Sequence, residues 1–334
     1  MNLKNGDALK FRDAGEGRLE LTLASGDRHK DSAPDKVLRI DASETSPNLL
    51  SRLLVGAYIT GQELIIVSAQ PALSTEQRAE IEKTVHRVLG MSIVEESPER
   101  VEIQNFIDPT KHQLSHLLAR VTRMLRMEVD VCRHALTERS VRPADEIQPI
   151  EEEVDRIYLL MARQLLLASD DFHVAKAIGV NSHHYQLGYR LVAKMLEVIG
   201  DHIYAIGGEL QTVAEHRRGL PSGGVEVVRG FLDQLERFLT QTTDAFARLS
   251  VTDANVTLNA ITEVLPQVYR EGDLFAQATR EKSAALAVQR IVLNLVNALE
   301  LLVVINEVTI NRAVEPETVA HSGGSVEISA VGPG

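Results

Sequence analysis

Apolar residues recur at alternating steps of four and three through most of the second half of the chain, which predicts amphipathic helices packed into bundles. The clearest run lies within residues 181–215, at Val192, Leu196, Ile199, Ile203, Ile206 and Leu210. A second run with the same steps comprises Ile291, Leu295, Ala298, Leu302, Ile305 and Thr309. A shift of 99 residues (291 − 192) superimposes the two runs. The match predicts a tandem duplication.

We expect the duplication to consist of two three-helix units, at residues 108–218 and 225–313. The Gly- and Pro-rich stretch Gly219–Gly224 separates them and has the composition of a loop. In the second unit the expected helices are 225–249, 255–269 and 273–312, and Pro266 is expected to kink or end the middle one. Residues 314–334 contain prolines and glycines without helical spacing, which predicts a flexible tail.

The first third of the chain shows shorter, strand-like patterns. Residues 8–12 and 19–23 alternate between apolar and polar positions, which predicts a β-hairpin within a first segment of residues 1–35. Residues 36–107 alternate strand and helix patterns, which predicts a small α/β domain. The expected fold class is therefore α+β, with a hairpin and a small α/β segment followed by an all-α domain of two tandem three-helix bundles.

Composition and net charge limit the fold classes and the binding partners that the chain can have. The apolar share is 44%, aromatics are only 4% and there is no Trp, which favours helical bundles over β-sandwiches. The net charge is −12, and residues 1–110 carry 13 basic against 18 acidic residues, which argues against binding to a phosphate backbone. Cys132 stands alone and is expected to be a small core residue. We see no signal peptide and no apolar run of about 18 residues, so we expect a cytoplasmic protein without membrane insertion.

Two pairs of carboxylates supply candidate chemistry. Glu197 and Asp201 are one helical turn apart, on a face that points away from the apolar stripe. Glu151 and Asp155 repeat this spacing on the preceding helix, so two antiparallel helices can bring four carboxylates together. Oxygen ligands suit hard cations such as iron, manganese, magnesium or calcium, and suit zinc less well. The competing interpretation of each pair is a solvated acidic surface.

The second unit keeps only part of this pattern. The shift of 99 residues maps Asp201 onto Glu300 and Glu197 onto Val296. Glu300 is therefore a fifth candidate metal residue, without its partner, and we expect metal binding in the second unit to be weak or absent.

Histidines and arginines near these helices have simpler interpretations. His183, His184 and His202 could bind a metal, although a surface or hydrogen-bonded role is the more ordinary one. Arg120, Arg123 and Arg126 form a basic stripe that we expect to pair with nearby acids rather than with nucleic acid.

The stretch Leu196–His202, with Ile206 further on, resembles the signature helix of the PhoU proteins. The tandem three-helix units and the Glu151–Asp155 pair on the preceding helix extend this resemblance. It implies a cytoplasmic, non-enzymatic regulator of phosphate uptake that acts with a Pst-type phosphate transporter, through its ATPase or its permease. It also implies multinuclear iron or zinc on the Glu-x-x-x-Asp motifs, and the oxygen-rich ligand set adds magnesium to the candidates.

The whole layout resembles the archaeal PhoU-like subgroup, in which an AbrB/SpoVT-type hairpin domain comes first. Residues 3–23 resemble the second half of such a domain, whereas its first strand and basic turn are absent, so DNA binding is not expected. The alternative is an AbrB-type transcription regulator with a PhoU sensory domain, and a homodimer is left open. A di-metal enzyme is a third reading, but ferritin-like sites use Glu-x-x-His motifs that these helices lack.

Overall fold

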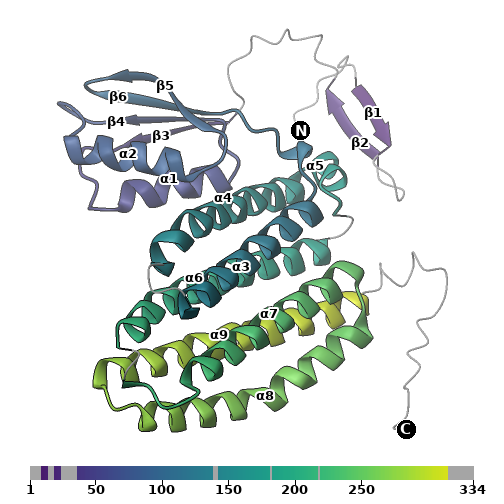
Figure 1. The fold of residues 1–334 in the computed structure, drawn as a ribbon. Helices are drawn as coiled ribbons and strands as arrows, with labels where there is room; N and C mark the ends of the chain where they lie inside the picture. Colours follow the sequence, from purple (N-terminus) through teal and green to yellow (C-terminus); the bar gives the residue numbers. More distant parts are fainter. Residues whose placement is uncertain are drawn as a thin grey trace. The chain divides into compact units, whose positions relative to one another are not determined.

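The computed structural model describes residues 9–13, 19–23, 36–137, 142–180, 183–216 and 219–314. The chain divides into two compact units (Figure 1). The first comprises residues 1–107 with 170–174, and the second comprises residues 108–169 with 175–334. Every described strand belongs to the first unit, and the long helices belong to the second, so the α+β fold class is confirmed.

The predicted hairpin forms from β1 (Leu9–Asp13) and β2 (Leu19–Leu23). The two strands pair antiparallel, with Phe11 opposite Leu21. Residues 3–8 and the turn at 14–18, on which the likeness to an AbrB/SpoVT domain partly rests, lie outside the described residues.

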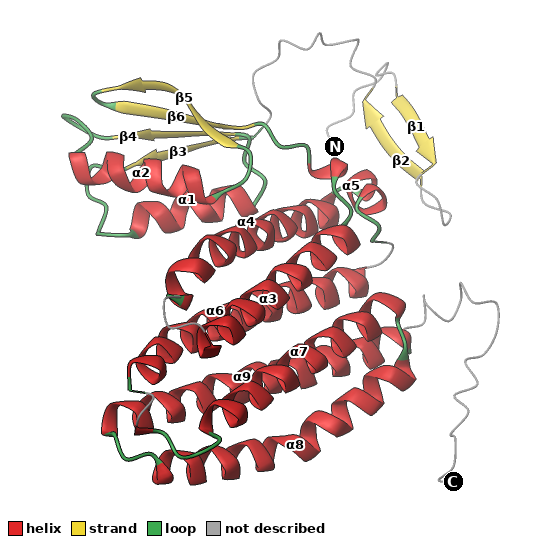
Figure 2. Cartoon of the chain, viewed as in Figure 1, coloured by secondary structure: helices red, strands yellow, loops and turns green. Residues whose placement is uncertain are grey.

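The α/β part of the first unit is a sheet in the order β3-β4-β6-β5 (Figure 2). Its strands are β3 (Val37–Asp41), β4 (Leu64–Ser68), β5 (Met91–Ser97) and β6 (Arg100–Asn105). β3 and β4 are parallel, while β6 runs antiparallel to both of its neighbours. The helices α1 (Leu49–Ile59) and α2 (Thr75–Arg87) lie against one face of the sheet. In the strand β4, three consecutive residues are buried, Ile65, Ile66 and Val67.

The first half of the helical unit contains α3 (Leu114–Thr137), α4 (Pro143–Asp170) and α6 (His183–Glu215). A short helix, α5 (Phe172–Ala177), which the sequence pattern did not predict, connects α4 to α6. It is too short to show a helical period. Cys132 is fully buried on α3, as expected of a core residue.

The second half contains α7 (Gly224–Arg248), α8 (Val251–Ala278) and α9 (Lys282–Ala313). The prediction that the helix ends at Pro266 was wrong, because α8 continues beyond this proline for about three further turns. Ile261 and Val268, on either side of the proline, are both buried, so packing outweighs the missing hydrogen bond. The break falls instead at residues 279–281, where the Glu281 carboxylate accepts hydrogen bonds from the backbone N–H groups of Ser283 and Ala284 and begins α9.

The helix α9 is the central element of the helical unit and packs against α6, α7 and α8. All six residues of its apolar stripe are buried. Among the described helices, α9 alone is long and apolar enough to cross a membrane, with a mean hydropathy of 1.8, which the sequence analysis did not anticipate. Half of that apolar window is buried in the unit, as is typical of the core helix of a bundle.

Candidate functional site

Two antiparallel helices, α4 and α6, bring the four predicted carboxylates together. Burial, followed by the nearby charges of Asp155, Asp201 and Glu197, raises the pKa of Glu151 to about 7. The pKa of Asp201 is also raised, first by burial and then by Asp155. Each carboxylate thus lies within electrostatic reach of the others, as the one-turn spacing on both helices predicted.

A proton and an ammonium group neutralise part of this negative charge. The carboxyl group of Glu151 shares a hydrogen bond with the Asp201 carboxylate, which joins α4 to α6. Lys194, one turn before Glu197 on α6, donates a hydrogen bond to its carboxylate. The Lys194 ammonium also lies 5.1 Å from the centre of the Tyr158 ring on α4. These contacts occupy the places where a bound cation would supply positive charge.

Glu197 departs from the outward position expected of it. Only 9% of its surface is exposed, and this burial raises the pKa of its carboxyl group while Lys194 lowers it. Asp201, by contrast, is exposed. The cluster therefore combines an exposed carboxylate with a buried one.

A fifth carboxyl group, which the sequence analysis missed, lies beneath the four. Glu128 on α3 is completely buried, and neither of its carboxyl oxygens has a hydrogen-bond partner. Burial, followed by the charges of Glu151 and Asp201, raises its pKa to about 9. The signal was available, because Glu128 occupies a position of the apolar stripe of α3 between Leu125 and Cys132.

A glycine of α6 lies next to this side chain. Gly200 lies on α6 next to Asp201, and a Cβ added there would be 3.1 Å from Leu125 Cδ2 and 3.8 Å from Glu128 Oε2. The contact with Leu125 is tight, whereas the contact with Glu128 is an ordinary van der Waals distance. The missing side chain of Gly200 therefore brings the α6 backbone close to the buried carboxyl group.

Of the remaining candidates, His202 acts on the cluster, because its charge lowers the pKa of Asp201. Glu300 is exposed on α9, and its neighbour Val296 is fully buried. His202 is within 2.9 Å of the Asn294 Oδ1 on α9, through its Nδ1, which fits the ordinary hydrogen-bonded role. The side chains of His183 and His184 lie outside the described residues.

The basic stripe on α3 largely pairs with acids, as expected. Arg120 bonds to Glu153 at 2.8 Å, and Arg126 bonds to Glu236 at 3.0 Å.

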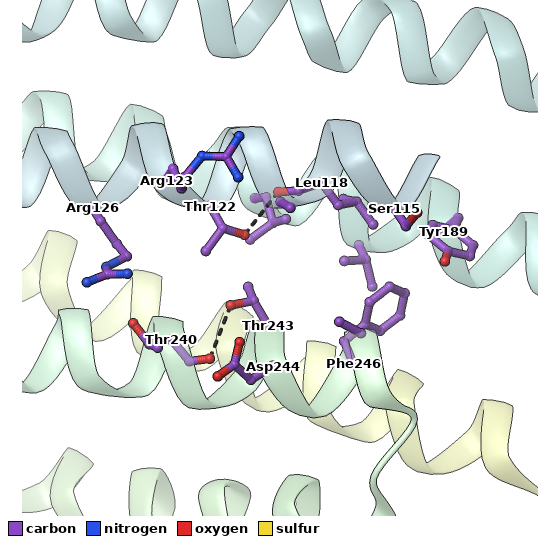
Figure 3. A pocket seen from close by; sticks show the side chains of 14 residues that line it. Ser115, Leu118, Thr122, Arg123, Arg126, Tyr189, Thr240, Thr243, Asp244 and Phe246 are labelled. Carbon is purple, nitrogen blue, oxygen red and sulfur yellow. Dashed lines mark hydrogen bonds between the residues drawn. The ribbon is translucent and has the colours of Figure 1, made fainter. Parts of the chain in front are cut away.

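A cavity of about 250 Å³ lies where α3, α6 and α7 meet (Figure 3). Arg123 and Arg126 of α3 lie on one wall, and Thr240, Thr243 and Asp244 of α7 lie on the other. None of the four clustered carboxylates lines this cavity. It is therefore separate from the site between α4 and α6.

The donor set of the cluster suits a cation, although its present geometry is not that of a bound metal. Within the described ranges, no group of three or more His, Cys, Asp or Glu side chains is arranged to hold a metal ion. The chemistry nevertheless fits a hard cation, because several carboxyl groups with raised pKa values surround buried oxygens that lack partners. A cation would replace the shared proton and the Lys194 ammonium.

Comparison with known proteins adds one domain assignment. Residues 114–209 match the family model described as PhoU domain. No curated protein sequence matches the chain. Among solved structures, the crystal structure of PhoU from Pseudomonas aeruginosa is similar, with a TM-score of 0.48 and 16% identity over 59% of this chain and 93% of that chain. The matched domain includes α3, α4 and most of α6, and with them every member of the carboxylate cluster.

Proposed function

We propose, from the PhoU domain that residues 114–209 form, that this protein is a non-enzymatic regulator of phosphate uptake. The observation that carries the proposal is the position of the carboxylate cluster inside the matched domain. Glu151, Asp155, Glu197 and Asp201 all belong to it, and their charges are coupled.

The cluster is proposed to bind iron, zinc or magnesium through these four carboxylates. A bound cation would supply positive charge that offsets the mutual repulsion of the carboxylates and cross-links α4 to α6. Lys194 and the hydrogen bond between Glu151 and Asp201 offset part of the same repulsion. The role of the metal is then structural and regulatory.

The proposed partner is the ATPase or the permease of a Pst-type phosphate transporter. A chain with a net charge of −12 is attracted to basic surfaces. The apolar helix α9 is half buried by its neighbours, which supports contact through protein surfaces instead of insertion into the bilayer. The protein would accordingly work at the cytoplasmic face of the membrane.

Deletion and complementation in the source cell test this function. Uptake of radiolabelled phosphate should become insensitive to external phosphate when the gene is deleted, and the wild-type gene should restore the response. Complementation with Asp201→Asn should fail, whereas Glu300→Gln, which changes an exposed carboxylate outside the matched domain, should succeed. Unchanged uptake in the deletion strain, in both phosphate-rich and phosphate-poor medium, would contradict the proposal.

A further inference from the structure

We propose that Glu128 is an inner ligand of the cation site, so that the first three-helix repeat binds its cation with five carboxylates from three helices. This inference rests on the metal binding proposed above and adds α3 to the helices that hold the ion. The two Glu-x-x-x-Asp motifs supply ligands from α4 and α6 only, so neither motif predicts Glu128.

The position of Glu128 is the first support. Its side chain points from α3 into the interior of the repeat, where it is completely buried. The charges of Glu151 on α4 and Asp201 on α6 raise its pKa, so it lies within electrostatic reach of both. Its Oε2 is 3.8 Å from the place of a Cβ on Gly200, one residue before Asp201. The carboxyl group therefore lies beside Gly200, within electrostatic reach of two outer carboxylates, Glu151 and Asp201.

The unsatisfied oxygens are the second support. Buried polar atoms nearly always have a hydrogen-bond partner, and those that lack one call for an explanation such as an absent ion. Both oxygens of Glu128 lack a partner. A cation bound between α4 and α6 would supply the missing interaction, and it would do so for a carboxyl group that has no basic partner among the residues that the structure describes.

The second repeat shows that the fold does not need a carboxyl group at this position. The buried residues of α3 and α7 superimpose at a shift of 110, so that Leu125 corresponds to Leu235, and Val129 to Leu239. At this shift (128 + 110 = 238), Glu128 corresponds to Phe238, which is also fully buried. An apolar ring thus fills the equivalent place in a repeat of the same architecture.

The second repeat also lacks most of the residues that correspond to the four outer carboxylates. The buried residues of α4 and α8 superimpose at a shift of 107, with Val154 on Ile261 and Met161 on Val268. The same shift places Leu258 and Thr262 where the first repeat has Glu151 and Asp155. With Val296 in place of Glu197, the second repeat lacks three of the four outer carboxylates as well as the inner one. Glu128 is therefore present in the repeat that has all four outer carboxylates, and an apolar residue replaces it in the repeat that lacks three of them.

The experiment measures lanthanide binding to the intact chain and to two variants. Tb³⁺ is a hard, oxygen-seeking cation, and its luminescence lifetimes in H₂O and D₂O give the number of water molecules on the bound ion. Glu128→Gln keeps the shape of the side chain but removes its charge, and Glu128→Phe copies the second repeat. Glu300→Gln is the matched control on an exposed site.

If Glu128 binds the ion, Glu128→Gln should retain helicity, weaken Tb³⁺ and Mn²⁺ binding by at least about 10-fold, and add about one water molecule to bound Tb³⁺. Glu128→Phe should show the same loss while folding normally. Glu300→Gln should change neither quantity.

Two results would overturn the inference in distinguishable ways. Wild-type protein that binds neither Tb³⁺, Mn²⁺, Fe²⁺ nor Zn²⁺ would remove the metal site itself and the inference with it. Wild-type protein that binds these ions, with equal affinity and equal hydration in the Glu128 variants, would leave the outer site in place and exclude Glu128 as a ligand.

Discussion

The carboxyl group of Glu151 on α4 is hydrogen-bonded to the carboxylate of Asp201 on α6. One proton is thereby shared between two helices, and it is held there because burial and neighbouring charges raise the pKa of Glu151 to about 7. A cation that binds at this place must displace that proton, so binding should strengthen as the pH rises through neutrality.

Asp201→Asn should remove most of the bound metal while leaving the helix content unchanged, because Asp201 is a surface carboxylate and its backbone lies within a long helix. Metal analysis by inductively coupled plasma mass spectrometry after dialysis measures the loss, and circular dichroism checks the fold. Glu300→Gln is the control and should change metal content little. Equal loss in both variants would show that the second repeat also binds metal.

Lys194→Gln should increase cation affinity. The Lys194 ammonium bonds to the Glu197 carboxylate and so competes with a metal for the same oxygens. Its removal makes the cluster more negative and frees a ligand. Isothermal titration with Mn²⁺ should show binding that is several-fold tighter than in the wild type, and a weaker affinity would indicate that Lys194 organises the site. Lys176→Gln on α5 serves as a charge-matched control.

The stability of the metal-free protein should fall as the pH rises from about 5 to 9. The pKa of Glu128 is raised from 4.5 in the unfolded chain to about 9 in the fold, by burial and by the charges of Glu151 and Asp201. A raised pKa favours the folded state below pH 4.5, and this contribution is lost as the pH rises through 9. At pH 7 the loss is on the order of 3 kcal/mol.

Thermal melts in the presence of a chelator measure this dependence. Glu128→Gln should flatten the dependence and raise the melting temperature at pH 8 relative to the wild type. A variant as steeply pH-dependent as the wild type would show that other groups control the titration.

Two glycines should respond in opposite directions to substitution by alanine. At Gly272 on α8, an added Cβ would lie 2.4 Å from Val292 Cγ2 on α9, and the β-branched valine cannot rotate away easily. Gly272→Ala should therefore destabilise the fold by about 1–3 kcal/mol. At Gly230 within α7 an added Cβ meets nothing within 4 Å, so Gly230→Ala should stabilise by about 0.5–1 kcal/mol. Urea titrations compare the two, and the same sign in both would contradict the packing of α8 on α9.

DNA binding by this chain should be undetectable at physiological salt. Residues 1–110 carry 13 basic against 18 acidic residues, and affinity for duplex DNA depends mainly on Lys and Arg that neutralise phosphates. Gel retention with an excess of random duplex checks this. Retention at low salt that weakens steeply with added salt would revive the transcription-regulator alternative.

The sequence predicted the features that follow from helical periodicity. It did not predict the features that depend on contacts between helices. The matched stripes on α6 and α9 revealed the long helices, and the spacing of Glu151 and Asp155 against Glu197 and Asp201 predicted four carboxylates on adjacent helices. The position of Pro266 could not reveal that α8 continues through it, because that depends on packing against α9. In the sequence, Glu128 is visible only as a single acid in an apolar stripe. Its place beside the carboxylate cluster depends on Gly200 and Asp201, which are distant from it in sequence.

The packing of α6 along α9 has a mechanical consequence. These helices, 33 and 32 residues long, are the most extensively contacting pair among the described elements, and each spans roughly 50 Å. Tightly packed helices move against one another by sliding over small distances and do not bend freely. A shift of α6 on cation binding would therefore be transmitted through α9 to the outer surface of the second repeat. The second repeat, which has one of the four outer carboxylates, would in this way respond to cation binding in the first.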